Sequence, residues 1–269
     1  MSVNKDPNGR RWVGAEVELK ATPEQVWEAV ATGHGVSSWF VPTEVRDDGT
    51  VVSYFGPGME AVAKQTAYEK PHRFAAESPG PGPGAPPMAT EWTVEARDGG
   101  VCVVRVVHSL FAEGDDWDDQ LESFEAGWPW FFAVLRLYVE RFSGRRCRPF
   151  RLIGVVEGEG ESAWTAVLGD LGFGVPREGE AITSSSSAPS VAGVVEKTGE
   201  GGHPLALMAV LDQPAPGILS MFAHAMGGQT HVVMDFYFYG PEADAAVERD
   251  EPLWRDWAAK RLGPVGAPC

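Results

Sequence analysis

The strongest constraint on the fold is a long amphipathic stretch, Asp116–Ser143, whose large apolar side chains recur at the spacing of a helix. These side chains are Trp117, Leu121, Phe124, Trp128, Phe131, Leu135, Tyr138 and Phe142. Pro129 lies inside the stretch and lacks a backbone donor, so we expect a kink between Gly127 and Trp130. Because the rings gather on one face, this helix needs a second layer to cover them.

A strand and a helix start signal open the chain. Residues 13–19 alternate between apolar and polar side chains, which is typical of a half-buried strand. Thr22-Pro23-Glu24-Gln25 then combines a capping box with a proline at the first helical position. We expect this helix to end at Gly33 and a second short helix to cover Val36–Phe40.

Turn signals divide the next part of the chain into six strands. They are Asp48-Gly49, Gly56-Pro57-Gly58, Lys70-Pro71, the loop Pro79–Pro87 and Asp98-Gly99-Gly100. A three-residue loop at Asp98–Gly100 predicts a hairpin that pairs Trp92 with Val106 and Val94 with Val104. The order of strand, two helices, six strands and long helix predicts an α+β helix-grip fold, an antiparallel sheet wrapped around the long helix.

The same order starts again after this helix, which favours an internal repeat. Phe150–Gly158 is predicted to be a strand, and Ala163–Val167 repeats the pattern of Val26–Val30. Further strands are expected at Val191–Lys197, Leu205–Leu211, Ile218–Ala225 and Thr230–Tyr239, with a closing helix over Glu242–Leu262. Ser184–Ser187 fits a loop or an edge strand. We therefore expect two domains, residues 1–146 and a shorter, diverged copy at 147–269.

Composition and charge limit the classes of partner and the cellular compartment that we expect for this chain. With 269 residues the chain suits two ordinary domains, and its net charge of −16 repels phosphate backbones and anionic lipid surfaces. We therefore expect neither nucleic acid nor membrane partners. The first residues lack the apolar run of a signal peptide, and three distant cysteines suggest neither disulfides nor zinc. These features favour a cytoplasmic, bacterial-type protein.

Two motifs carry a resemblance to a known family. They are V17-E-L-K-A-T-P-E-Q-V-W27 with the nearby Val36–Phe40, and E125-A-G-W-P-W-F-F-A-V-L135 in the long helix. Over about residues 12–144 the chain resembles the SRPBCC (START-like) superfamily, in the branch related to the C-terminal domain of the heat-shock ATPase activator. The resemblance implies a ligand cavity between long helix and sheet, in a family that binds lipids, polyketides or hormones, acts as cyclases or assists a chaperone. The activator's separate N-terminal domain has no counterpart in this sequence.

Several residues on the predicted inner faces are candidates for ligand binding. They are Trp39, Tyr54, Trp92, His108, Trp128, Phe131 and Tyr138. Apolar walls with a few polar groups are usual in small-molecule sites, although large aromatic residues also form ordinary cores. His108 lies on an apolar face, where desolvation should lower its pKa and keep it neutral. A structural role for His108 and a role as a base both remain open.

Other titratable clusters suggest no site. A Gly227-Gly228 loop would place His224 opposite His231, with Asp235 on the same face, but this pair should face solvent. We predict no metal and no cofactor. The acidic residues that open the long helix suit its dipole and solubility; they are Glu113, Asp115, Asp116, Asp118 and Asp119. The sequence contains no GxSxG, HExxH or GxxxxGK[ST] motif.

These observations favour a non-catalytic binding protein that holds a hydrophobic small molecule in the first domain. The second domain would then be a lid, an interface or a stabiliser. One alternative is a cyclase or hydrolase-like enzyme that uses His108 or a tyrosine such as Tyr54 as acid or base. Another is a chaperone-associated or other protein-interaction module. A homodimer is also open.

Overall fold

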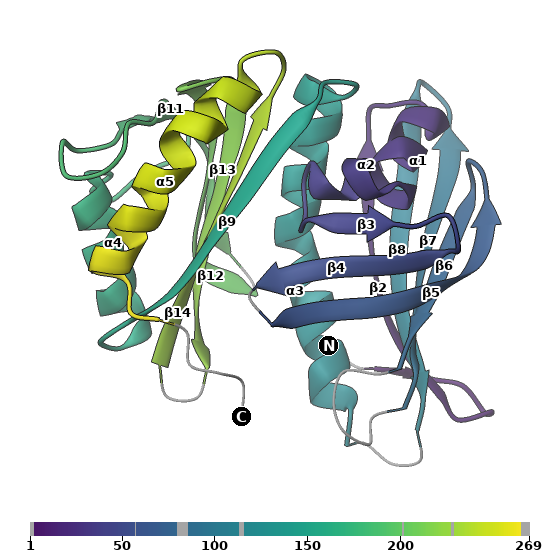
Figure 1. Ribbon diagram of the computed structural model, residues 1–269. Coiled ribbons are helices and arrows are strands. Elements are labelled where there is room, and N and C mark those ends of the chain that lie inside the picture. The colour runs from purple at the N-terminus through teal and green to yellow at the C-terminus, as the bar shows by residue number, and fades with distance from the viewer. Residues whose placement is uncertain are drawn as a thin grey trace. The chain divides into compact units, whose positions relative to one another are not determined.

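The computed structural model describes residues 3–56, 58–79, 86–112, 116–200, 202–226 and 229–264 (Figure 1). The chain divides into two compact units, Met1–Gly144 and Arg145–Cys269. Each unit has its own antiparallel sheet and its own long helix.

The first unit has the predicted helix-grip order. Its elements are β1 (Asn4–Lys5), β2 (Arg10–Leu19), α1 (Pro23–Ala31), α2 (Gly33–Ser37), β3 (Thr43–Val45), β4 (Thr50–Gly56), β5 (Met59–Glu69), β6 (Arg73–Ser78), β7 (Met88–Arg97), β8 (Val101–Phe111), α3 (Asp118–Leu137) and a π-helical turn (Tyr138–Phe142). The strand order in the sheet is β1-β2-β8-β7-β6-β5-β4-β3. The sheet curves around α3 (Figure 1), so one face is concave and faces the helix.

The capping box of α1 forms as predicted, but the second helix begins earlier than predicted. Thr22 accepts from the backbone N–H of Gln25, whose side chain accepts from the backbone N–H of Thr22. α1 ends at Ala31 and α2 covers Gly33–Ser37 instead of Val36–Phe40. The cause is Thr32, whose hydroxyl accepts from the backbone N–H of Gly35 at 3.0 Å and so caps a new helix.

The β7–β8 hairpin has the predicted register. Trp92 pairs with Val106, Val94 with Val104 and Ala96 with Cys102. The face of this hairpin with Trp92 and Val104 is buried, whereas Arg105 points outward from β8 and lies over the Trp12 ring at 5.6 Å. The buried residues of this hairpin therefore form an apolar part of the concave face.

An ion pair fixes the start of α3 to β2. Arg11 donates twice to the Asp118 carboxylate, at 2.7 and 2.5 Å, and Lys5 adds a third contact at 3.3 Å. The hydrogen bond from Arg11 lowers the pKa of Asp118. Pro129 is on the exposed side of α3, and the kink expected there stays a prediction. The expected acidic residues Glu113 and Asp115 lie outside the described residues.

The second unit repeats this plan in shorter form. Its elements are β9 (Cys147–Val156), α4 (Gly160–Leu171), β10 (Ala181–Thr183), β11 (Ala192–Glu200), β12 (His203–Gln213), β13 (Gly217–Met226), β14 (Gln229–Tyr239) and α5 (Ala243–Arg261). Its first strand β9 pairs with its last strand β14, as β2 pairs with β8 in the first unit. The strand order is β10-β11-β12-β13-β14-β9, and Ser184–Ser187 follows the edge strand β10 as a loop.

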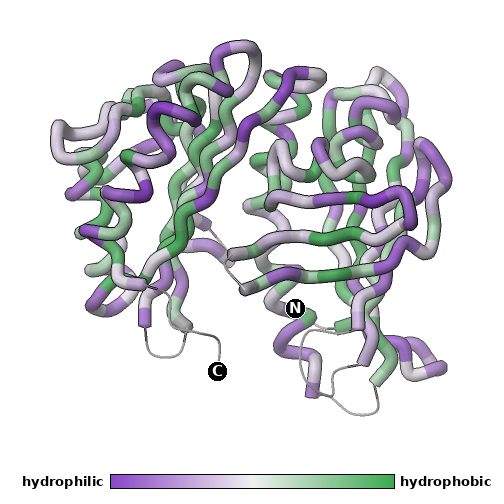
Figure 2. Tube along the Cα trace, in the orientation of Figure 1, coloured by the Kyte–Doolittle hydropathy of each residue, from purple (hydrophilic) through white to green (hydrophobic). Residues whose placement is uncertain are grey.

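Helices α4 and α5 cover one face of this second sheet (Figure 1). Its core joins Trp164 and Leu168 of α4 with Trp254 and Trp257 of α5 and the apolar strand residues between them. The trace is hydrophobic along the central strands of this sheet, whereas turns and outer helix surfaces are more hydrophilic (Figure 2). Along β14, however, the residues of both faces of the sheet are buried.

Candidate ligand-binding site

An aromatic cluster fills the space between α3 and the concave face of the first sheet. It comprises Trp39, Phe40, Phe55, Trp92, His108, Phe124, Trp128, Phe131 and Phe132. Trp128 is at its centre, with its ring centroid 5.2 Å from that of Trp92 and 5.6 Å from that of Phe40. These distances and angles are those of favourable aromatic pairs.

His108 is locked into this cluster by two hydrogen bonds. The indole N–H of Trp128 donates to Nε2 of His108 at 3.0 Å. Nδ1 lies 3.0 Å from the hydroxyl of Thr90, its cross-strand partner. Since Nε2 accepts, the neutral ring carries its proton on Nδ1, which donates to Thr90. Burial lowers the pKa of His108 to about 4, as the sequence predicted in direction.

This geometry favours a structural role for His108. A general base needs a free nitrogen lone pair, and the Nε2 lone pair already accepts from Trp128. The imidazole also stacks on the Trp128 ring, with the two planes 16° apart. His108 therefore sets the orientation of Trp128 and, through it, of the rings that surround that side chain.

The concave face remains partly open along β4 and β5. The register pairs Ser53 with Ala61 and Val51 with Ala63, so these side chains share a face. Phe55 lies two residues beyond Ser53 on that face and contacts Phe40. Ala61 is exposed, and Ser53 and Ala63 are partly exposed. We call this partly exposed surface of small side chains, made of Ser53, Ala61 and Ala63, the β4–β5 groove.

Three phenylalanines from separate elements border this groove. Phe40 follows α2, Phe55 belongs to β4 and Phe131 to α3. The Phe40 ring centroid is 4.8 Å from that of Phe131 and 5.9 Å from that of Phe55. All three are partly exposed, whereas Trp128 behind them is buried. Apolar rings thus reach the surface directly in front of a rigid buried indole.

The structure brings most of the predicted site residues together. Five are in the aromatic cluster: Trp39, Trp92, His108, Trp128 and Phe131. Tyr138 is buried in the π-helical turn after α3. Tyr54 is on the opposite face of β4, where Glu44 and Arg46 surround its hydroxyl, so the structure does not bring it to the cluster. The desolvation and the Glu44 carboxylate raise the pKa of Tyr54.

Sequence reasoning missed Phe40, Phe55 and the small residues of the groove. The alternation along β4 could have found Phe55, since Ser53 and Phe55 share one face and Tyr54 takes the other. The rest of this face gave no signal, because the groove residues Ser53, Ala61 and Ala63 are too small to indicate a site.

Cys102 has no features of a nucleophile. Its thiol is buried and donates to the Ala21 carbonyl at 3.1 Å. Burial raises the pKa of this thiol, which disfavours the reactive thiolate.

The histidine pair of the second unit forms, but its surroundings differ from the prediction. His224 lies opposite His231, with ring centroids 5.6 Å apart. We expected both to face solvent, yet His231 is buried. Asp235 is held by Arg151 at 2.5 and 2.8 Å, so its carboxylate is engaged. Among the described residues no group of three histidine, cysteine or acidic side chains is arranged to hold a metal; the predicted Gly227-Gly228 loop lies outside them.

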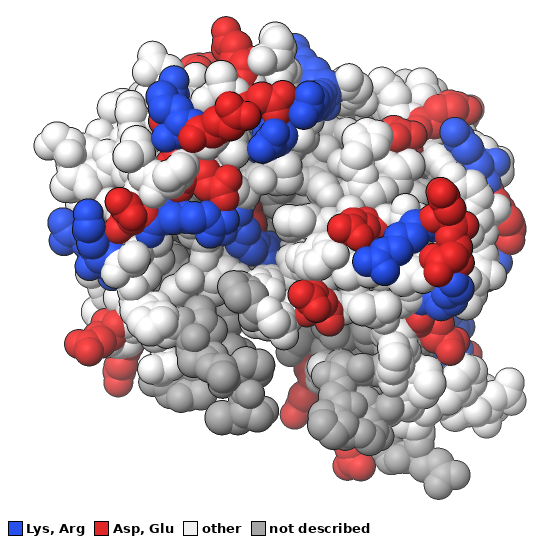
Figure 3. Space-filling model, in the orientation of Figure 1, with Lys and Arg blue, Asp and Glu red and all other residues white. Residues whose placement is uncertain are grey.

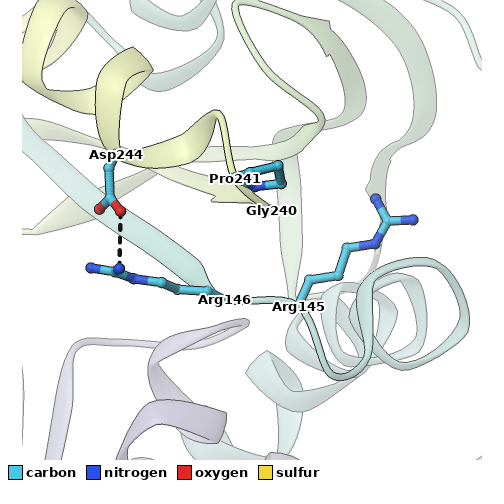
Figure 4. A pocket seen from close by; sticks show the side chains of 5 residues that line it. All are labelled: Arg145, Arg146, Gly240, Pro241 and Asp244. Carbon is cyan, nitrogen blue, oxygen red and sulfur yellow. Dashed lines mark ion pairs between the residues drawn. The ribbon is translucent and has the colours of Figure 1, made fainter.

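A surface hollow of about 580 Å³ lies at the start of α5 (Figure 4). It is lined by Arg145, Arg146, Gly240, Pro241 and Asp244. Asp244 pairs with Arg146 at 3.0 Å and with Arg148 at 2.6 Å, while Arg145 extends away from it (Figure 4). The predicted site residues are elsewhere, and Asp244 already compensates the charge of Arg146 here.

On the face shown in Figure 3, basic and acidic side chains lie next to one another. The expectation of neither nucleic acid nor membrane partners stays a prediction. In the part of the chain that the structure describes, no helix combines the length and hydropathy needed to span a bilayer.

Most of the first unit matches a known family. Residues 20–140 match the family described as Activator of Hsp90 ATPase homolog 1-like protein. This match agrees with the resemblance to the SRPBCC (START-like) superfamily that the two sequence motifs carry. No curated protein matches the chain.

Solved structures similar to the chain include single-unit and two-unit proteins. The di-domain ARO/CYC BexL from the BE-7585A biosynthetic pathway is 13% identical, with 96% of this chain and 100% of that chain covered and a TM-score of 0.44. DynU16, from the dynemicin biosynthetic locus, is 15% identical over 93% and 95% of the two chains, with a TM-score of 0.41. The Aha1 dimer from Colwellia psychrerythraea is 19% identical over 48% and 96%, with a TM-score of 0.41.

Proposed function

We propose that the first unit is a binding protein that holds an apolar small molecule in the β4–β5 groove. The observation that carries this proposal is the set of three partly exposed rings, Phe40, Phe55 and Phe131, in front of the buried Trp128. A flat apolar ligand lying between these rings and the small side chains of β5 would remove both surfaces from water. Each 100 Å² of apolar surface buried in this way contributes roughly 2.5 kcal/mol.

The rigidity of the aromatic wall supports binding. Trp128 is fixed by His108, and Trp39 donates its indole N–H to the Ala29 carbonyl at 2.8 Å. Side chains that are already fixed lose little conformational freedom when a ligand binds. The wall is therefore preorganised for a flat apolar surface.

The geometry favours binding over catalysis. Acid or base catalysis requires titratable groups that converge on one reacting position. Here the nitrogens of His108 are used within the cluster, and Tyr54 is on the opposite face of the sheet. His108 and Tyr54, the residues named for the cyclase or hydrolase alternative, therefore do not converge on one position. The chaperone partner, the homodimer and the cytoplasmic location remain predictions.

A pair of substitutions on one strand tests the proposal. Ala63→Trp would fill the groove, whereas Val62→Trp adds the same bulk on the opposite, exposed face of β5. Binding of the uncharged dye N-phenyl-1-naphthylamine is followed by its fluorescence. We expect Ala63→Trp to weaken binding at least about tenfold and Val62→Trp to leave it unchanged. Circular dichroism checks that both variants fold; equal dye affinity for all three proteins would refute the proposed site.

A further inference from the structure

The surface hollow of about 580 Å³ in the second unit forms where β9 begins and β14 ends. Cys147, the first residue of β9, pairs with Tyr239, the last residue of β14. This register brings the flanking residues Arg146 and Gly240 together, and the Gly240 N–H donates to the Arg146 carbonyl at 2.9 Å. All the lining residues belong to the second unit. Its backbone hydrogen bonds therefore fix the hollow within this unit.

The segment that enters β9 is basic, although the chain as a whole is acidic. The chain has 22 Lys and Arg against 38 Asp and Glu, whereas residues 144–151 contain four arginines and no acidic residue. One of the four, Arg151, is held by the buried Asp235. The other three arginines are in or beside the hollow, so this part of the unit concentrates positive charge.

A single aspartate balances part of that charge. Arg145 and Arg146 line the hollow, and Asp244 is the acidic residue among its lining side chains. Arg148 donates from Nη1 to Oδ1 of Asp244 at 2.6 Å, and Nη1 of Arg146 lies 3.0 Å from Oδ2 (Figure 4). Both carboxylate oxygens are thus engaged. Three guanidinium groups and one carboxylate leave an excess of two positive charges.

Donors of these arginines are accessible from solvent. Two guanidinium groups have more N–H donors than one carboxylate has acceptor positions, so Asp244 cannot engage all those of Arg146 and Arg148. The Arg146 side chain is 69% exposed and that of Arg148 is 37% exposed. Arg145 is exposed as well. An anion that enters the hollow from water can therefore reach guanidinium donors without displacing Asp244.

We propose that this hollow binds the phosphate group of a small phosphorylated molecule, with Arg146 and Arg148 as its main donors. A phosphate dianion balances the two excess positive charges, whereas a carboxylate or a sulfate ester balances one. The planar guanidinium fork also suits phosphate oxygens. A volume of about 580 Å³ leaves space for the rest of a small molecule. The inference is independent of the proposed function of the first unit.

Two aryl esters of similar shape test the charge of the ligand. At about pH 8 phenyl phosphate carries close to two negative charges, whereas phenyl sulfate carries one. Isothermal titration calorimetry of the full chain at low ionic strength measures both affinities. We expect phenyl phosphate to bind roughly 3- to 10-fold more tightly. Equal affinities would overturn the charge match, and a wild-type chain that does not bind phenyl phosphate would overturn the site.

Arginine substitutions test the position of the site. Arg146→Gln and Arg148→Gln should each weaken phenyl phosphate binding roughly 3- to 10-fold. Arg255→Gln is the matched control, because it removes the same charge from an exposed arginine of α5 that pairs with Glu251. It should keep the wild-type affinity. Equal weakening in all three variants would show that the net charge of the chain acts instead of the hollow.

Asp244→Asn should change the affinity in the opposite direction. The amide keeps the size of the carboxylate and removes its negative charge, so phenyl phosphate should bind roughly 2- to 5-fold more tightly. Asp256→Asn, at an exposed position of the same helix, controls for net charge and should leave the affinity unchanged. Circular dichroism checks that both variants fold. Weaker binding to a folded Asp244→Asn protein would mean that the arginines need Asp244 as their partner, and it would contradict the proposal.

Discussion

Trp128 donates its indole N–H to Nε2 of His108 at 3.0 Å, and this bond links the long helix α3 to strand β8. The same imidazole reaches Thr90 on β7, so three elements meet at one buried ring. Because Trp128 donates to Nε2, the proton of the neutral His108 ring is on Nδ1, and this nitrogen donates to Thr90. It also ties the rigidity of the proposed site to the stability of the first unit.

Trp128→Phe should destabilise the first unit by about 2–4 kcal/mol. The change removes part of a buried ring and leaves Nε2 of His108 without a donor, and each effect costs roughly 1–2 kcal/mol. Urea unfolding measures the loss. Trp117→Phe, at the partly buried start of the same helix, is the matched control and should cost less than about 1 kcal/mol. Equal losses for the two variants would contradict the importance assigned to the hydrogen bond.

The burial of neutral His108 predicts a pH dependence of stability. Its pKa is about 4 in the folded chain and about 6.5 when unfolded, so below pH 6.5 the unfolded state binds the extra proton. The free energy of unfolding should fall as pH drops from 6.5 toward 4, by up to about 3 kcal/mol. His108→Gln should lack this part of the slope, and the difference between wild-type and variant unfolding at several pH values measures it.

His72→Gln is the control for that measurement, because His72 is an exposed imidazole of the same unit. It should follow the wild-type pH dependence. A His108→Gln profile parallel to the wild type would show that His108 is not buried as a neutral ring.

Periodicity predicted the fold well because the relevant signals are local. The capping box at Thr22, the hairpin loop at Asp98–Gly100 and the apolar face of Asp116–Ser143 each depend on a few neighbouring residues. The predicted start of α2 was wrong, because the sequence contains many threonines that could cap a helix and does not distinguish Thr32 from the others. Only the approach of the Gly35 backbone to Glu28 shows that the chain turns there, since a Cβ at Gly35 would lie 1.8 Å from the Glu28 carbonyl oxygen.

The site was predicted only in part, because the groove is lined by small side chains, which give no distinctive signal in the sequence. The large rings of Trp92, Trp128 and Phe131 indicate an apolar interior, and all three were predicted from the sequence as candidate site residues. The small residues Ser53 and Ala63 become informative only when the register shows that they share a face and stay partly uncovered.

The Arg11–Asp118 pair should respond unequally to loss of either partner. The Arg11 side chain is 7% exposed and that of Asp118 is 20% exposed. Asp118→Ala removes two hydrogen bonds from a buried guanidinium and should cost about 3 kcal/mol. Arg11→Met leaves a carboxylate that water and Lys5 can reach and should cost about 1 kcal/mol. Unfolding in urea at pH 7 compares them, and a larger loss for Arg11→Met would contradict the assigned burial.

Two glycines of the second unit should respond to alanine in opposite directions. A Cβ at Gly154 of β9 would lie 2.4 Å from Cβ of Leu262 and 3.1 Å from the Gly263 carbonyl, so Gly154→Ala must push the end of α5 away from the sheet. We expect a loss of about 1–3 kcal/mol, as for other overpacked sites. Gly169 of α4 has open space around the same atom, so Gly169→Ala should add about 0.5–1 kcal/mol through helix propensity. Thermal unfolding measures the stability of both variants. A Gly154→Ala protein as stable as the wild type would mean that α5 does not end against β9.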